Sequence, residues 1–211
     1  MEYLIYLILI FLFCSFNFTD FYVKKVSKNG QKTWSSHIGS SYVWKNHSKL
    51  ASLIIFCGDS ILKGFFPIFV ARRIMDFDAV IPSNVFTNNE MYLIPIVLIQ
   101  IIANNWSIFL KFKGGRGMAV IIGIILGLNP FPLAICLYVI YIIAWTKIRD
   151  GGPSWIIALI ATTLISIPIS NVTSICLLAC ILLTLLKRIL GNSITKKYTI
   201  IKNRLIFDRD C

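Results

Sequence analysis

The chain has 211 residues, of which 57% are hydrophobic and only 14% are charged, and its formal net charge is +12. Soluble domains average about 45–50% apolar and about 25% charged residues, so this composition excludes a disordered chain, a fibrous repeat and an ordinary soluble enzyme. It indicates a polytopic membrane protein with an all-α fold. The positive charge then indicates cytoplasmic loops and anionic headgroups rather than nucleic acid.

Six apolar runs follow one another along the chain. The first, residues 3–18, has Glu2 where a signal peptide carries basic residues and has no small-residue cleavage site, so we expect a retained helix. The other runs cover residues 50–70, 91–110, 118–146, 155–169 and 172–186. The run at 118–146 is either one long tilted helix or two short ones. Pro130 and Pro132 lie near its middle, and prolines disfavour a helix there.

The number of lysines and arginines that each topology places in the cytoplasm decides between the two. Residues 24–49 carry six lysines and no acidic residue, which predicts a cytoplasmic segment and an N-terminus outside the cell. If the run at 118–146 crosses the membrane twice, 18 of the 21 lysines and arginines fall on the cytoplasmic side. We therefore expect seven membrane segments, with the N-terminus outside and the C-terminus cytoplasmic. The whole chain, 1–211, is predicted to be one domain, with a cytoplasmic and disordered tail at 191–211.

Six cysteines are scattered along the chain without any CxxC pair, so neither a zinc site nor a disulfide framework is expected. The sequence also has no carboxylate cluster to hold a metal, and we expect neither a metal nor another cofactor.

A glycine-rich segment at residues 111–119 is the first candidate site. Three cations, Lys111, Lys113 and Arg116, are interleaved with glycines at the start of an expected helix. The glycines are Gly114, Gly115 and Gly117. Glycines let the backbone approach a ligand, and a helix N-terminus with a guanidinium binds phosphate well. A flexible basic turn against anionic lipid is an equal alternative on composition alone.

Two further polar features precede it. Residues 33–45 hold four serines, His37 and Gly39 and end in Lys45; hydroxyls and a lysine can hold phosphate, and a histidine can move a proton. A merely hydrophilic loop is the simpler interpretation. Asp59 and Lys63 stand four residues apart within an apolar run, so they can pair on one helix face, for function or as a structural intramembrane pair.

The order of these clusters resembles the bacterial acyl-phosphate-dependent glycerol-3-phosphate acyltransferases. The second motif of that family, F-K-G-G-K-G-V-A preceded by a histidine, matches Phe-Lys-Gly-Gly-Arg-Gly-Met-Ala at 112–119, with Asn104 at the histidine position and Arg116 at that of the second lysine. The first motif, G-S-G-N-x-G-A-T-N-V-x-R, falls on residues 34–45. Ser35, Gly39 and Val43 are kept there, while Ser41 replaces a threonine and Lys45 an arginine.

The resemblance also covers the D-x-x-K-G pattern in type, at residues 59–64, but it weakens at both ends of the chain. Little beyond Ser15 is kept of the family's first helix motif. The third motif, H-x-x-N-I-x-R-L-x-x-G-x-E, is reduced to an arginine, a leucine and a glycine within residues 187–192, and no role is transferred to these residues. The chain is thus similar to a divergent member of the family.

The resemblance implies acyl transfer from acyl phosphate to the 1-hydroxyl of glycerol 3-phosphate, an early step of phospholipid synthesis in the plasma (inner) membrane. Ser35, His37, Lys45 and Arg116 are the implied catalytic residues. The implied substrate-binding residues are Asn104, Gly39, Ser41, Lys113, Gly114, Gly115 and Gly117. Two alternatives remain open: a catalytically impaired relative that binds lipid precursors or a partner enzyme, and a small anion carrier that uses Asp59 and Lys63.

Overall fold

The computed structural model describes residues 1–26, 39–73, 90–128, 132–192 and 197–207. All the regular structure in these ranges is helical, which confirms the expected all-α fold. The elements that build the bundle are α1 (Glu2–Ser15), α4 (Lys49–Gly58), η1 (Asp59–Phe65), α5 (Phe66–Arg73), α6 (Leu93–Asn105), α7 (Met118–Leu128), α8 (Pro132–Ile148), α9 (Gly151–Ser166) and α10 (Asn171–Leu190).

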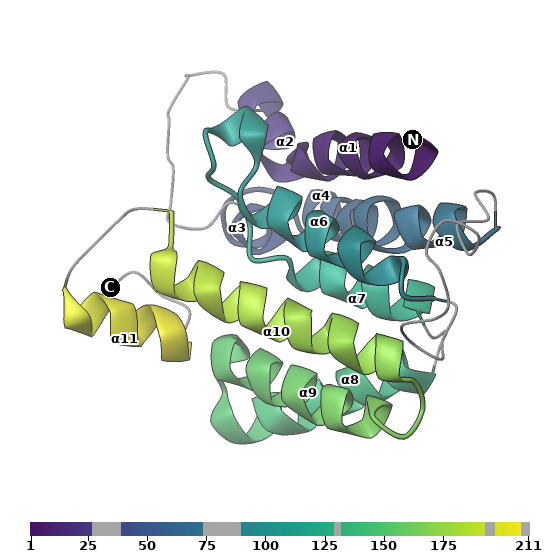
Figure 1. Ribbon diagram of the computed structural model, residues 1–211. Coiled ribbons are helices and arrows are strands. Elements are labelled where there is room, and N and C mark those ends of the chain that lie inside the picture. The colour runs from purple at the N-terminus through teal and green to yellow at the C-terminus, as the bar shows by residue number, and fades with distance from the viewer. Residues whose placement is uncertain (27–38, 74–89, 129–131, 193–196, 208–211) are drawn as a thin grey trace.

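The bundle helices lie side by side and alternate in direction along the chain (Figure 1). Among the described residues, three helical stretches are long and apolar enough to cross a membrane: Glu2–Val26, Lys49–Arg73 and Asn171–Leu190. The helices between them are shorter but also apolar. The run at 118–146 forms two helices, α7 and α8, as the proline pair predicted.

The bundle core consists of aliphatic side chains from every long helix, including Ile10, Ile68, Ile96, Ile124 and Leu177. Many other large apolar side chains stay exposed on the outer surface of the bundle, for example Leu4, Ile54, Ile142 and Leu182. A soluble monomer rarely leaves so much apolar surface uncovered. This surface agrees with the membrane assignment made from composition.

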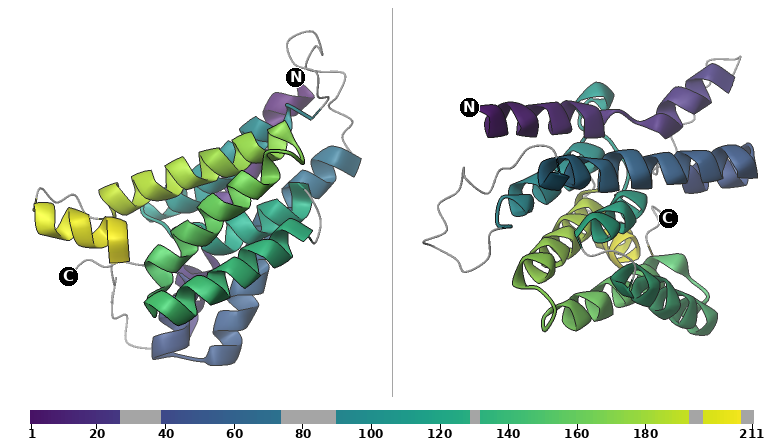
Figure 2. Two further views of the ribbon diagram at one scale, coloured as in Figure 1. Left: turned by 90° about the horizontal axis from the view of Figure 1, so that it is seen from below. Right: turned by 90° about the vertical axis from the view of Figure 1, so that its right-hand side faces the viewer.

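Two short helices lie at the end of the bundle where α1 ends. The segment α2 (Phe18–Val26) continues α1 at an angle, and α3 (Ser40–Asn46) precedes α4 (Figure 2). The α1 helix stops because Phe16 adopts an extended backbone. The apolar run at 91–110 is also shorter as a helix than expected. Helix α6 ends at Asn105, and the following residues turn into the glycine-rich loop.

The expectation of a disordered tail is wrong for residues 198–207. Residues 198–207 form helix α11 (Tyr198–Phe207), which packs on α10 and α9. Its buried Arg204 donates to the Leu190 carbonyl (3.3 Å) and so satisfies the end of α10. In the other direction, Arg188 donates to the carbonyls of Leu205 (3.3 Å) and Gly152 (3.1 Å). The arginine kept from the third motif therefore joins three helices.

Candidate functional site

The glycine-rich loop, residues 106–117, connects α6 to α7 as a tight hairpin at the same end of the bundle as α3 and α11 (Figure 1). A backbone bridge joins Ser107 to Lys113, and the turn between them contains the positive φ angles of Lys111 (53°) and Phe112 (60°). Lys111 and Lys113 point outward and are exposed, while Arg116 is half-buried. The loop thus presents its cations at the end of the bundle.

Two glycines of the loop are required by its backbone. A Cβ atom on Gly114 would overlap the carbonyl oxygens of Asn104 and Asn105, and Gly117 has a φ of 74°, which other residues rarely adopt. The end of α6 therefore lies directly against the loop. Asn104, a predicted binding residue, is buried there and accepts a hydrogen bond from the Gly115 N–H through its carbonyl (3.2 Å).

The structure differs from the sequence expectation about which backbone groups face a ligand. The N–H groups of Gly114 and Gly115 are hydrogen-bonded within the protein, to the side chain of Asn192 and to the carbonyl of Asn104. The first intrahelical hydrogen bond of α7 runs from the Ile121 N–H to the Gly117 carbonyl (2.8 Å). The N–H groups of residues 118–120 come before that bond and have no partner within the helix. They are therefore the backbone donors that the N-terminal end of α7 offers to an anion.

Asn192 clamps the loop to the end of α10. Its side chain accepts from the Gly114 N–H (3.1 Å) and donates to the Gly114 carbonyl (3.0 Å), so one amide pairs with both backbone groups of one residue. Lys187 donates to the same Asn192 oxygen (2.9 Å), which fixes the amide orientation. Sequence reasoning missed both residues, because they lie in the degenerate third motif, where motif matching transfers nothing.

Lys187 is a buried cation in this site. Its side chain is only 2% exposed, and its ammonium lies 5.1 Å from the centre of the Trp106 ring. Arg116 belongs to the loop that Asn192 holds against this end of α10. Within the described part of the chain, no aspartate or glutamate forms an ion pair with Lys187. The site therefore concentrates positive charge in a partly desolvated place.

The first-motif residues are only partly described. Ser35 and His37 lie outside the described residues. Gly39 is the N-cap of α3, and Ser41 and Lys45 lie one turn apart on that helix with exposed side chains. Helix α3 packs on α4 and α2, and its Ser40 carbonyl accepts from Ser52 (2.7 Å).

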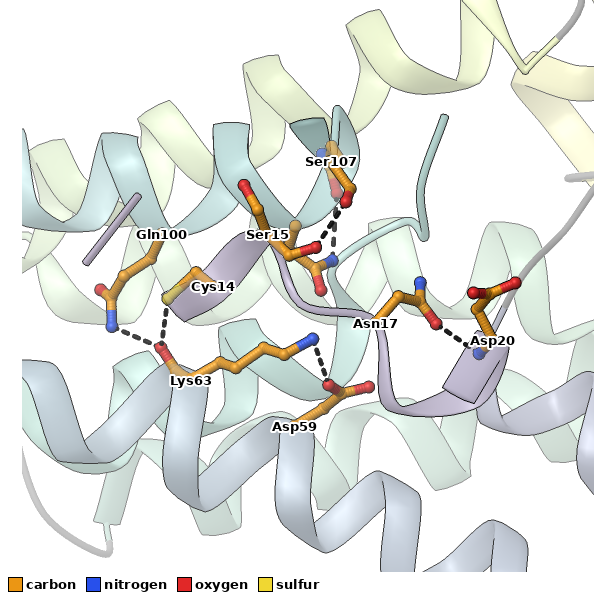
Figure 3. Close-up of polar contacts among 10 residues, drawn as sticks. Cys14, Ser15, Asn17, Asp20, Asp59, Lys63, Gln100 and Ser107 are labelled. Atoms are coloured by element: carbon orange, nitrogen blue, oxygen red, sulfur yellow. Dashed lines mark hydrogen bonds and ion pairs between the residues drawn. The ribbon is translucent and has the colours of Figure 1, made fainter. Parts of the chain in front are cut away.

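The Asp59–Lys63 pair forms as the spacing predicted, with 2.6 Å between Lys63 Nζ and Asp59 Oδ1. The pair lies in η1, a π-helical segment, and Lys63 is 1% exposed with its ammonium 4.9 Å from the Phe18 ring centre. The Gln100 side chain donates to the Lys63 carbonyl (2.6 Å; Figure 3). It also donates to the Gly64 carbonyl (2.8 Å). These contacts make the pair part of the packing between helices.

A model of the glycerol-3-phosphate acyltransferase family matches residues 4–194. The chain belongs to this family. Among its relatives, a glycerol-3-phosphate acyltransferase of Geotalea daltonii is 27% identical over 124 residues, which cover 58% of this chain and 57% of that protein. One of Wolbachia pipientis wMel is 28% identical over 150 residues, which cover 71% of each chain. The Geotalea alignment thus spans little more than half of that relative.

The fold is also that of a solved acyltransferase. The glycerol 3-phosphate form of PlsY (YgiH), an integral membrane glycerol 3-phosphate acyltransferase, superimposes with a TM-score of 0.75 at 19% identity and covers 89% of this chain and 88% of PlsY. The lysophosphatidic acid form gives a TM-score of 0.74 at 20% identity. The family match ends at residue 194, so helix α11 lies beyond it.

Proposed function

We propose that this membrane protein transfers an acyl group from acyl phosphate to the 1-hydroxyl of glycerol 3-phosphate, giving lysophosphatidic acid for phospholipid synthesis. The observation that carries this proposal is the glycine-rich loop, which holds Arg116 directly before α7 and is clamped by Asn192 to the end of α10, where Lys187 lies. Two cations and the helix N–H groups suit phosphate groups. The family assignment supplies the acyl-transfer chemistry.

The reaction needs positioning and charge stabilisation from this site. Cations at the loop hold the phosphates, which brings the acceptor hydroxyl to the acyl carbon. The hydroxyl attacks the acyl carbon directly, and the bond from that carbon to the phosphate oxygen breaks. Inorganic phosphate leaves with the electrons of that bond and takes up the hydroxyl proton. Donors at the loop stabilise the negative charge that develops on the carbonyl oxygen. We assign the catalytic work to Ser35, His37, Lys45 and Arg116, and the binding of substrates to Asn104, Gly39, Ser41, Lys113, Gly114, Gly115 and Gly117.

We further propose that the chain is one domain with seven membrane segments in the bacterial plasma membrane. In this arrangement the glycine-rich loop, α3 and α11 face the cytoplasm, where a water-soluble acceptor is available. The acyl chain of the donor lies among the apolar helices. An anion carrier is a weaker proposal, because Lys63 is buried against Asp59 and Phe18 rather than placed along a water-filled path.

Complementation tests the proposal in a cell. The chain is expressed in a bacterial glycerol-3-phosphate auxotroph that lacks its own acyltransferase. We expect growth without added glycerol 3-phosphate, and no growth with the Arg116→Ala variant at equal membrane abundance. Absence of growth with the parent chain present in the membrane would favour the impaired relative instead.

A further inference from the structure

We propose that helix α11 lies on the membrane surface and binds anionic phospholipid headgroups of the bilayer that holds the bundle. The binding surface is the outward strip of the helix, which we define as Tyr198, Lys202, Leu205 and Ile206. The family match ends at residue 194, before this helix begins. The inference concerns a lipid contact and does not depend on acyl transfer.

The position of α11 is fixed at the level where a membrane span ends. Arg204 donates to the carbonyl of Leu190, which is the last residue of the apolar span Asn171–Leu190 (3.3 Å). Arg188, in the last turn of the same span, donates to the Leu205 carbonyl (3.3 Å). In the left view of Figure 2, α11 (yellow) slopes against the green helices of the bundle. A helix that is held at the end of a span and runs across the bundle is placed to lie along the membrane surface.

The outward strip is an apolar surface that the bundle does not cover. The opposite side of α11 is packed, since Arg204 is buried and Ile200 and Ile201, one turn before it, are half-buried. By contrast, all four residues of the outward strip are exposed, and Tyr198 is 76% exposed. A short helix with apolar side chains on two sides requires a second apolar environment. The boundary between headgroups and acyl chains provides one, and tyrosine is typical of that depth.

The charge of α11 favours an anionic lipid as the occupant. Lys202 lies one turn after Tyr198 in the outward strip, and Lys197 is exposed directly before the helix. The helix itself contains no aspartate or glutamate. A lysine can lay its methylene stem along apolar neighbours while its ammonium reaches phosphate groups at the surface. Exposed lysines among apolar and aromatic side chains therefore match an anionic lipid surface.

The test follows a fluorescent label on the outward strip. The full chain, with its native cysteines replaced by alanine and with Ile206→Cys carrying bimane, is purified in neutral detergent. We expect the bimane emission to shift to shorter wavelength as phosphatidylglycerol is added, and much less with phosphatidylcholine. Lys202→Gln should require about fivefold more phosphatidylglycerol for the same shift, which is the usual contribution of one lysine at an anionic surface.

Lys24→Gln is the matched control. Lys24 is also an exposed cation at this end of the bundle, but Asp20 already pairs with it (2.7 Å). This variant should titrate like the parent protein. Equal thermal unfolding midpoints of the parent and Lys202→Gln in detergent would verify that both are folded.

Three results would overturn the inference. The first is an equal emission shift with phosphatidylglycerol and phosphatidylcholine. The second is a phosphatidylglycerol titration that Lys202→Gln leaves unchanged. The third comes from nanodiscs that contain both lipids, in which a nitroxide at headgroup depth should quench the label. Absence of quenching would place the outward strip in water, where a soluble partner protein rather than lipid could cover it.

Discussion

Arg116 is the cation of the glycine-rich loop whose removal should be most costly. It replaces the lysine of the family motif and lies half-buried directly before α7. A charge-assisted hydrogen bond to phosphate is worth about 1.5–3 kcal/mol. We therefore expect Arg116→Ala to abolish acyl transfer or to raise the KM for glycerol 3-phosphate by about tenfold or more.

The matched variant Arg116→Lys should retain much more activity, because it restores the family residue and the charge. Steady-state kinetics with purified acyl phosphate as donor provide the measurement. If both variants behave like the parent, Arg116 lies outside the site.

His37 carries a separate prediction from the first motif. It stands where the family has asparagine, while the motif histidines are missing elsewhere, so we predict that it handles a proton or binds phosphate in their place. His37→Asn should then lower turnover and remove the acidic limb of the pH–rate profile. A profile that is unchanged from about pH 5.5 to 8, the range in which histidine ordinarily titrates, would show that His37 is only a neighbour of the site.

At the scale of elements, the contact between η1 and α7 depends on two glycines. A Cβ atom on Gly64 would lie 2.7 Å from the Cα of Gly123, and one on Gly123 would overlap the Ser60 carbonyl. Small residues allow membrane helices to approach so closely. Gly123→Ala should therefore destabilise the fold by at least about 1–3 kcal/mol, the usual cost of overpacking.

Gly58→Ala is the control for that variant. Gly58 is also helical, but an added Cβ would meet only the Phe18 ring at 3.9 Å, which is an ordinary contact. It should leave stability equal or slightly higher, since alanine favours helix. Thermal unfolding of both proteins in the same detergent separates them. Equal unfolding midpoints would show that η1 and α7 do not require this glycine contact.

The sequence predicted most bundle helices, because apolar runs and prolines determine the structure of the segment in which they lie. The proline pair split the run at 118–146, and the i,i+4 spacing predicted the Asp59–Lys63 pair. The π-helical form of η1 could not be predicted, because the amide that satisfies its carbonyls comes from Gln100 in another helix. For the same reason the clamp between Asn192 and Gly114 escaped prediction, since the two residues are 78 positions apart.

Helix α11 in the tail also could not be predicted from its own segment. Its charges and short apolar stretches favour no helix by themselves, yet α11 forms. Docking supplies the stabilisation: Arg204 satisfies the end of α10 and Arg188 reaches back to Leu205. Within the glycine-rich loop, motif matching identified the right segment but not the internal use of the Gly114 and Gly115 N–H groups.

At the scale of the whole molecule, the seven-segment topology makes a labelling prediction. In a variant whose cysteines are replaced by alanine, Lys202→Cys on α11 should resist a membrane-impermeant maleimide in intact cells and react after permeabilisation. Glu2→Cys should react in intact cells, because the N-terminus is predicted to lie outside. Labelling of Lys202→Cys in intact cells would contradict the topology. With the N-terminus outside, it would favour an even number of membrane crossings.

The most direct test is acyl transfer by the purified full chain in lipid nanodiscs. With acyl phosphate and glycerol 3-phosphate, the account predicts lysophosphatidic acid and inorganic phosphate in equal amounts, at a rate far above that of Arg116→Ala. If the parent protein forms no more lysophosphatidic acid than Arg116→Ala, while both are folded and embedded, the proposed acyltransferase function is contradicted.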